Sequence, residues 1–150
     1  MTTRQQIREF LAQPRLALVG ASRSGKGFGN YALKELTAKG YDVLPVHPEA
    51  DAIHGFRCNR RLSELPSDVT SLIVVVPPTA TERVVEEAAS VGLKRVWLQQ
   101  GAESQEAIDA CRRHGIEVVH GECILMYAEP AGFVHRAHRW LWRVFGKLPG

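Results

Sequence analysis

Aliphatic runs alternate with amphipathic stretches along most of this 150-residue chain. The aliphatic runs predict strands, and the stretches between them, whose apolar residues recur at helical spacing, predict helices. Nearly continuous apolar strands between such helices are typical of a parallel sheet covered on both faces. The sequence therefore predicts an α/β fold with a Rossmann-like open, mainly parallel five-stranded sheet and helices on both faces. The predicted strands are 16–20, 42–47, 71–76, 95–99 and 117–120, and the predicted helices are 29–39, 79–91 and 104–114 after a short opening helix.

Residues at the ends of the predicted helices support this alternation. Gly40, Gly92 and Gly115 each follow a predicted helix, where a left-handed residue commonly ends the last turn. Thr79 stands three positions before Glu82, which is the spacing of a capping box. We therefore expect a capping box at the start of the helix predicted over 79–91.

A glycine-rich segment joins the first predicted strand to the following helix. Between residues 20 and 29 it contains four glycines together with Arg23 and Lys26. The first N–H groups of a helix have no partner within the helix, and the helix dipole places partial positive charge at the same end. Phosphate groups bind readily at such a position. The segment therefore predicts a phosphate-binding loop.

The glycine-rich segment does not fit a nucleoside triphosphatase. Residues 20–26 satisfy the P-loop pattern G-x-x-x-x-G-K, but Gly27 stands where that pattern needs a Ser or Thr hydroxyl for magnesium. The strand predicted over 71–76 runs into Pro77 and Pro78 without an acidic residue for the metal. Both differences argue against phosphoryl transfer.

The pattern of an NAD-binding domain is also incomplete. The segment lacks the opening glycine pair of G-x-G-x-x-G, and the second predicted strand ends at His47-Pro48 in place of the carboxylate that holds ribose hydroxyls. An imidazole adds no negative charge beside a phosphorylated ribose. The sequence therefore favours a nucleotide that carries an additional phosphate over NAD.

Size and composition exclude several other classes of protein. A chain of this length fits one domain over residues 1–150, and its formal net charge of +3 is too small for a broad nucleic-acid-binding face. The sequence contains no run of about 18 apolar residues, so it predicts no membrane span. The odd number of cysteines, Cys58, Cys111 and Cys123, favours reduced thiols and a cytoplasmic location. We expect no catalytic and no metal-binding residue, since Cys123, His120 and the pair His135 and His138 have no spacing that requires such a role.

The candidate site follows from the predicted sheet. Ligands of open parallel sheets bind outside the carboxyl ends of the strands. The residues at these ends are Gly20-Ala21-Ser22, His47-Pro48, Pro77-Pro78, Gln99-Gln100-Gly101 and Gly121-Glu122-Cys123.

This series resembles the small single-domain CoA-binding protein family, and it is similar to the CoA-binding domain of the succinyl-CoA synthetase alpha subunit. The resemblance spans nearly the whole chain. Its parts are G-A-S-R followed by Lys26, G-Y-x-V-x-P-V-x-P over 40–48, V-P-P over 76–78, V-W-L-Q-x-G over 96–101, and Cys123. The chain departs from the family at His47, where Asn is common, and at Gly121-Glu122, where Asp-Arg is common.

The resemblance implies a geometry for coenzyme A. Its 3′-phosphate and pyrophosphate would lie over the first loop, where amides of Gly20, Ser22 and the following residues donate hydrogen bonds and two cations supply charge. The turn after the second strand would flank the adenosine. The prolines after the third strand would form a rigid wall for the pantetheine arm, or else serve only as the start of a helix. The residues after the fourth strand would close the far side of the site. The implied contacts are Gly20, Ala21, Ser22, Arg23, Lys26, Val46, His47, Pro48, Val76, Pro77, Pro78, Gln100 and Gly101.

The expected function is to bind coenzyme A or an acyl-CoA without chemistry of its own. Succinyl-CoA synthetase needs a phosphohistidine on a further domain and a partner subunit, so its ligase activity is not carried over. Two alternatives stay open: a nicotinamide-dinucleotide-binding oxidoreductase, and an acyl-CoA transferase or ligase subunit that lacks its partner. An amphipathic helix predicted at about 131–146 carries apolar and arginine faces; it is expected to pack on the domain, and its wide apolar face also allows a homodimer or partner-protein contact.

Overall fold

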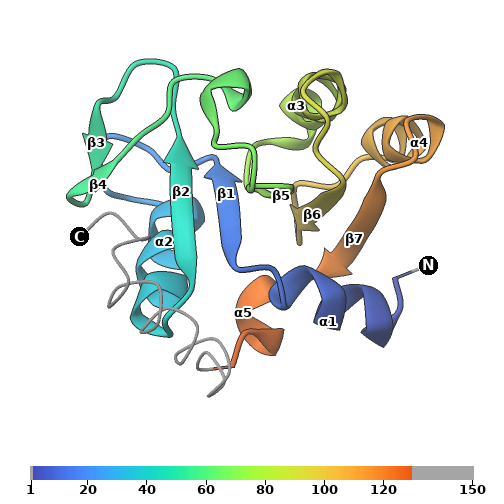
Figure 1. Cartoon of the computed structure of the whole chain (residues 1–150), viewed down its shortest axis with the longest axis horizontal. Coiled ribbons are helices and arrows are strands. Elements are labelled where there is room, and N and C mark those ends of the chain that lie inside the picture. The colour runs from blue at the N-terminus through green and yellow to red at the C-terminus, as the bar shows by residue number, and fades with distance from the viewer. Residues whose placement is uncertain (1, 130–150) are drawn as a thin grey trace.

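A five-stranded parallel sheet forms the centre of the computed structural model, which describes residues 2–129 (Figure 1). The strand order is β2-β1-β5-β6-β7. β2 therefore lies at one edge of the sheet, where a proline such as Pro45 is tolerated. The strands are β1 (Arg15–Val19), β2 (Asp42–Val46), β5 (Ser71–Val74), β6 (Arg95–Gln99) and β7 (Glu117–Glu122).

Helices cover both faces of this sheet, as the sequence predicts (Figure 1). One face is covered by α1 (Arg4–Leu11), α2 (Phe28–Ala38) and the short α5 (Ile124–Tyr127). The other face is covered by α3 (Pro78–Ser90), α4 (Gln105–Arg113) and the 3-10 helix η1 (Leu62–Glu64). The predicted α/β class, the five parallel strands and the order of elements are thus confirmed.

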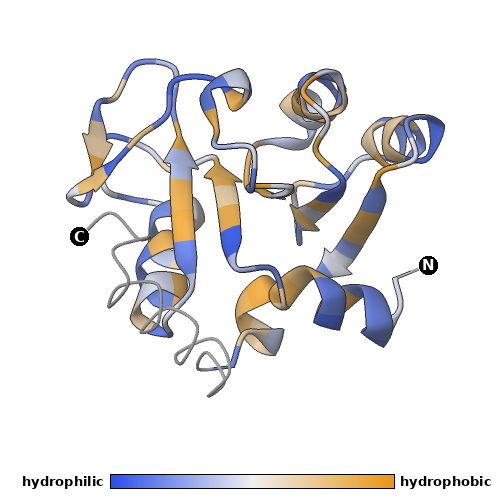
Figure 2. Cartoon of the chain, viewed as in Figure 1, coloured by the Kyte–Doolittle hydropathy of each residue, from blue (hydrophilic) through white to orange (hydrophobic). Residues whose placement is uncertain are grey.

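The strand residues divide between the two cores because successive side chains point to opposite faces. In β5, for example, Ile73 packs with α1 and α2, whereas Leu72 and Val74 pack with α3. Apolar residues are therefore favoured at nearly every position of such a strand; in β5 only Ser71 is polar, and Figure 2 shows the apolar stretches of β1 and β2 in orange.

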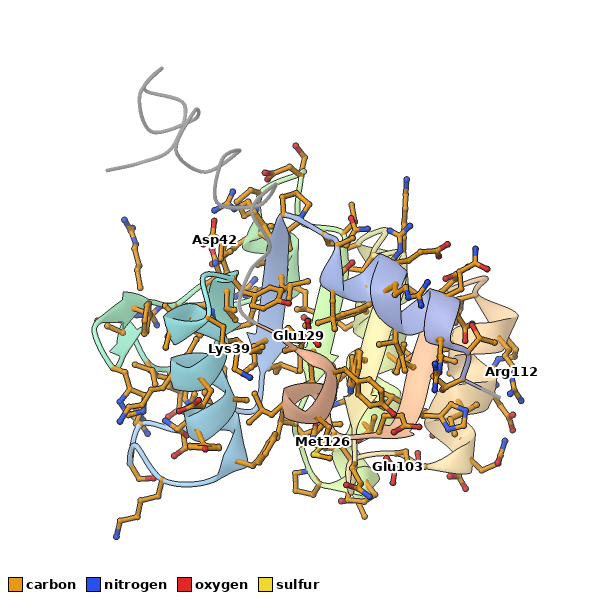
Figure 3. All side chains as sticks on the ribbon, turned by 90° about the horizontal axis from the view of Figure 1, so that it is seen from below. Lys39, Asp42, Glu103, Arg112, Met126 and Glu129 are labelled. Carbon is orange, nitrogen blue, oxygen red and sulfur yellow. The ribbon has the colours of Figure 1, made fainter. Side chains whose placement is uncertain are left out.

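Trp97 of β6 is fully buried and packs against aromatic residues of both α1 and α5. The indole ring packs edge-on against Phe10 of α1, with ring centroids 5.4 Å apart, and its Nε1 donates to the Glu122 carbonyl at 3.1 Å. α5 is tied to α2 as well, since the Lys39 amine donates to the Ala128 carbonyl at 2.6 Å; Figure 3 shows Lys39 and the neighbouring Glu129.

The segment after β2 contains a small hairpin, β3 (Ala52–Ile53) and β4 (Phe56–Arg57). Its return segment runs beside β2, because the His47 amide donates to the Asn59 carbonyl at 2.9 Å and the Asn59 amide donates to the Pro45 carbonyl at 3.0 Å. Two-residue strands have too little pattern to be seen in the sequence, so the hairpin was not predicted.

The helix ends agree with the sequence at their glycines but not at Thr79. Gly40, Gly92 and Gly115 all have positive φ, as expected of residues that end helices. The predicted capping box at Thr79 is wrong: α3 begins one residue earlier, at Pro78, and its N-cap is Pro77 without a side-chain cap. A proline suits the first position of a helix because its missing N–H would have no partner there.

No helix within residues 2–129 is long and apolar enough to cross a membrane. β7 continues two residues beyond its predicted end, to Glu122. The amphipathic helix predicted at about 131–146, and with it the proposed dimer or partner contact and His135 and His138, lies outside the described residues.

Candidate functional site

The glycine-rich loop leaves the sheet where the order of the strands reverses. The chain passes from β1 outward to β2 and then returns to β5 on the other side of β1. In open α/β sheets such a reversal is where ligands bind, outside the carboxyl ends of the strands. The Val75 amide donates to the Val19 carbonyl at 2.9 Å, so the exits of β1 and β5 are directly bonded.

Close packing at this exit requires glycine at two positions. Gly20 has φ of +121°, and a Cβ there would lie 2.0 Å from the Val75 carbonyl oxygen. A Cβ on Gly29, in the first turn of α2, would lie 2.5 Å from the Gly20 carbonyl oxygen. Neither neighbour can move aside, because both are backbone atoms. The first turn of α2 is therefore pressed against the exit of β1.

Asn30 holds the loop from inside α2. Its Oδ1 accepts from the Ser22 amide and its Nδ2 donates to the Ser22 carbonyl, both at 2.8 Å, and the residue is only 2% exposed. The Ser22 amide, which the sequence analysis assigned to a phosphate, is therefore engaged by Asn30. Asn30 itself was missed. Its signal in the sequence was an asparagine at a position that the helical spacing of apolar residues predicts to be buried.

The tip of the loop, residues 23–27, is exposed and closes on itself. The hydroxyls of Ser22 and Ser24 lie 2.6 Å apart, and the Lys26 amide donates to the Ser24 hydroxyl at 3.3 Å. Gly27 is the N-cap of α2, so no side chain caps this helix, and its first turn contains no acidic residue. The partial positive charge at this helix end is therefore not offset by the helix itself.

The two loop cations differ in their partners. Arg23 pairs with Glu49 at 2.9 Å, and the two side chains are 62% and 66% exposed. Lys26 takes part in none of the salt bridges among residues 2–129. His47 follows β2 where a dinucleotide-binding domain has its carboxylate, and Glu49, three residues beyond the last residue of β2, pairs with Arg23 instead. An exposed ion pair contributes little, so Arg23 can exchange Glu49 for another anion.

The end of β2 forms a tight turn around His47. The imidazole Nδ1 accepts from the amides of Glu49 at 3.0 Å and Ala50 at 2.9 Å. A ring nitrogen that accepts carries no hydrogen, which assigns the hydrogen to Nε2. His47 thereby takes on the local hydrogen bonding of an Asn in a turn. Val46 is buried in the sheet just before it.

The exits of β5 and β6 are joined through Thr81. Pro77 and Pro78 are exposed at the start of α3, so the structure gives them the role of a helix entry. The Thr81 hydroxyl lies 3.2 Å from the Pro77 carbonyl and 2.6 Å from the Ala102 carbonyl. Gln100 and Gly101 are exposed beyond β6, and the Gly101 amide donates to Glu103 Oε1 at 3.1 Å. Figure 3 labels Glu103 at this edge of the molecule.

The predicted residues thus come together at the carboxyl edge of one parallel sheet, in the order in which the strands are arranged. Close packing of Gly20 on Val75 connects the loop to the exit of β5, and the ion pair of Arg23 with Glu49 connects it to the turn after β2. Gln100 and Gly101 follow β6, which is separated from β1 by β5. An extended ligand would be needed to contact all of these exits.

A family model described as CoA binding domain matches residues 14–129. This chain belongs to the CoA-binding domain family. The match includes every residue assigned to the candidate site, and it confirms the family that the strand exits indicated. The fold agrees as well, since solved structures that are similar to this chain share its sheet and helices.

Three relatives show the range of proteins in which this CoA-binding domain occurs. The ADP-forming acetate–CoA ligase I of Archaeoglobus fulgidus is 28% identical over 129 residues, which are 79% of this chain and 19% of the ligase. The uncharacterized protein YneT of Bacillus subtilis is 26% identical over 123 residues, 81% of this chain and 91% of YneT. A conserved hypothetical protein from Pyrococcus furiosus is 43% identical, with a TM-score of 0.72, over 76% of this chain and 98% of its own.

The chain spans less than a third of the length of the acetate–CoA ligases it matches. A region similar to this chain is therefore one part of a large ligase and nearly the whole of the small protein YneT. Membership in the CoA-binding domain family gives this chain a CoA-binding fold related to ligase subunits.

Two of the three cysteines, Cys58 and Cys111, are poorly suited to nucleophilic chemistry. Burial raises the pKa of the Cys111 thiol to about 12, and burial together with the Asp51 charge raises the pKa of Cys58. Cys123 is half-buried at the start of α5. Its neighbour Glu122 accepts a hydrogen bond from the Tyr127 hydroxyl at 2.8 Å, which raises the pKa of that phenol. Residues 2–129 contain no group of three potential metal ligands.

Proposed function

We propose that this domain binds coenzyme A or an acyl-CoA at the carboxyl edge of its sheet, with the phosphates over the glycine-rich loop. One observation carries the proposal: the uncapped start of α2 lies against the exit of β1, with Arg23 and Lys26 on the exposed loop between them. A helix end without acidic residues, flanked by two cations, favours a phosphate ligand. Membership in the CoA-binding domain family supports coenzyme A as that ligand.

The proposed contacts follow the strand exits. Gly20 and Ala21 allow the ligand to approach the backbone, while Lys26 and, after release of Glu49, Arg23 pair with phosphate oxygens. Ser22 contributes through its hydroxyl, because its amide is held by Asn30. The turn of Val46, His47 and Pro48 lies beside the adenosine. The pantetheine arm extends past Val76, Pro77 and Pro78 toward Gln100 and Gly101.

The proposed role is binding without catalysis. A nucleophile or general acid–base pair needs side chains within hydrogen-bond reach of one another and of the reacting group. Around the glycine-rich loop, the side chains of Asn30 and His47 instead hold the backbone through their hydrogen bonds. The buried thiols of Cys58 and Cys111 remain protonated at neutral pH, which supports the same conclusion.

A second candidate is a subunit of an acyl-CoA ligase or transferase. It is favoured by the acetate–CoA ligases, in which a region similar to this chain is one part of a much longer enzyme. In that case the domain would present the CoA thioester to catalytic residues of a partner protein. Binding of coenzyme A is common to both candidates, and only activity in the presence of a partner separates them.

The experiment is isothermal titration calorimetry of ligand-stripped protein with coenzyme A, dephospho-CoA, acetyl-CoA, NAD, NADP and ATP. We expect saturable heat with coenzyme A and acetyl-CoA, and no saturation with NAD at the same concentrations. A ligand at 100 times its dissociation constant also stabilises the fold by about 2.7 kcal/mol, so melting curves provide an independent measure. Saturation with NAD but not with coenzyme A at millimolar concentration contradicts the proposal and supports an oxidoreductase.

A further inference from the structure

The turn of the β3–β4 hairpin contains His54 at a position where Asn is the preferred residue. Ile53 pairs with Phe56, so His54 and Gly55 form a two-residue turn with φ of +51° and +79°. Positive φ at both central positions characterises a type I′ turn, in which Asn-Gly is strongly preferred. A non-glycine residue at positive φ is uncommon, and Asn, Asp and His adopt this conformation more readily than other residues. His54 is the single non-glycine residue with positive φ among residues 2–129.

The hairpin is held firmly against the rest of the domain. Ile53 is 3% exposed in the core that α1 and α2 cover. The Cys58 amide donates to the Asp51 carbonyl at 2.8 Å, which closes the base of the hairpin, and Asn59 bonds to β2. The backbone position of His54 is therefore fixed by packing that does not involve the glycine-rich loop, and its side chain is exposed.

From this position the imidazole reaches the loop. His54 Nε2 lies 3.1 Å from Asn30 Nδ2, and a Cβ on Gly25 would lie 3.4 Å from His54 Cε1. The Asn30 Nδ2 atom has two hydrogens and no acceptor capacity. One hydrogen goes to the Ser22 carbonyl, so His54 Nε2 must accept the other. The carboxamide of Asn30 is thereby fully bonded, with Ser22 on both of its ends and His54 on the remaining hydrogen.

We propose that His54 is a positioning residue for the glycine-rich loop: it fixes the Asn30 carboxamide, which in turn fixes the Ser22 backbone from which the exposed loop tip extends. The inference rests on the proposed function of this loop as the phosphate site for coenzyme A. Without His54, a buried N–H of Asn30 lacks its acceptor, which is unfavourable enough to reorient the carboxamide. The choice of His over the Asn that this turn type prefers is then explained, since the His54 ring nitrogen lies 3.1 Å from Asn30 Nδ2.

The variants His54→Asn and His54→Gln separate this role from a merely structural one. Asn suits the turn but is too short to reach Asn30, whereas Gln has a carbonyl oxygen at a similar reach to Nε2. We expect His54→Asn to melt within a few degrees of wild type, because the better turn residue offsets part of the cost of the lost hydrogen bond, yet to bind coenzyme A about five-fold more weakly, the effect of one hydrogen bond. We expect His54→Gln to bind within about two-fold of wild type. Coenzyme A affinity of His54→Asn equal to that of wild type would overturn the proposal.

Two further measurements keep the inference distinct from the proposed function. In ligand-free protein, hydrogen exchange of the Ser22 amide should be about five-fold faster in His54→Asn and near the wild-type rate in His54→Gln, and an unchanged rate in both overturns the positioning role whatever the ligand. In Asn30→Ala, adding His54→Asn should cause no further loss of affinity, since the relay is already removed. His114→Gln, at the end of α4 and paired with Glu86, is the control that should change neither quantity. Failure of wild type to bind coenzyme A, with the exchange result as expected, refutes the ligand and leaves the positioning role intact.

Discussion

Gly29→Ala provides the sharpest test of the packing at the candidate site, because its expected sign is opposite to the usual one. Replacing glycine by alanine inside a helix normally stabilises a protein by about 1 kcal/mol. Gly29 lies in the first turn of α2 without positive φ, so the backbone itself accepts alanine. The new Cβ, however, would lie 2.5 Å from the Gly20 carbonyl oxygen and 2.9 Å from the Ala21 nitrogen.

The magnitude follows from these two effects. Overpacking against atoms that cannot move aside costs typically about 1–3 kcal/mol, and a contact of 2.5 Å with a backbone carbonyl belongs at the upper end. After subtraction of the gain in helix propensity, we expect Gly29→Ala to lower the free energy of unfolding by about 2 kcal/mol. For a domain of this size that corresponds to a melting temperature lower by roughly 6–8 °C.

Urea unfolding followed by circular dichroism measures this change, and Gly92→Ala is the matched control. Gly92 has φ of +81° and open space around its Cβ position, so alanine there is destabilising through the backbone alone, by about 1 kcal/mol. Because Gly29→Ala displaces the exit of β1, it should also weaken coenzyme A binding, while Gly92→Ala should not. A Gly29→Ala protein as stable as wild type or more so would refute the close approach of α2 to Gly20.

Two predictions concern single ionisable groups. Lys26→Ala should weaken coenzyme A more than dephospho-CoA if the amine pairs with the 3′-phosphate, and both equally, by about ten-fold, if it pairs with the pyrophosphate; calorimetry with both ligands decides, and unchanged affinity for both removes Lys26 from the site. For Cys111, burial raises the pKa in the folded state to about 12, so the unfolded thiol ionises first and stability should fall between pH 9 and pH 12, by up to about 1.4 kcal/mol per pH unit. Urea unfolding of wild type and Cys111→Ala at pH 8 and pH 10 measures the difference, and parallel losses in both proteins would contradict the assignment to this thiol.

The strands and long helices follow from patterns that lie within a few residues of one another. All four residues of β5, Ser71–Val74, are buried, and three of them are aliphatic. Such a run of aliphatic side chains is favourable only in a strand that is covered on both faces of the sheet. The glycines of residues 20–29 can also be recognised in the sequence itself. Gly20 and Gly29 are required because a Cβ at either position would collide with backbone atoms. The parallel sheet, the thin loop and the edge at which a ligand would bind could therefore be predicted from the sequence.

Only the tertiary structure decided which polar groups of this edge are already engaged. Asn30 holds Ser22 from eight residues away, Glu49 pairs with Arg23 from 26 away, and His54 bonds to Asn30 from 24 away. No periodicity relates such positions, because hydrogen-bond partners are chosen by how the chain returns to the loop after β2 and through the short hairpin. Burial can be inferred from the spacing of apolar residues. A hydrogen bond between distant segments instead requires a donor–acceptor distance that is correct to within a few tenths of an ångström, and that distance is set only when the chain is folded.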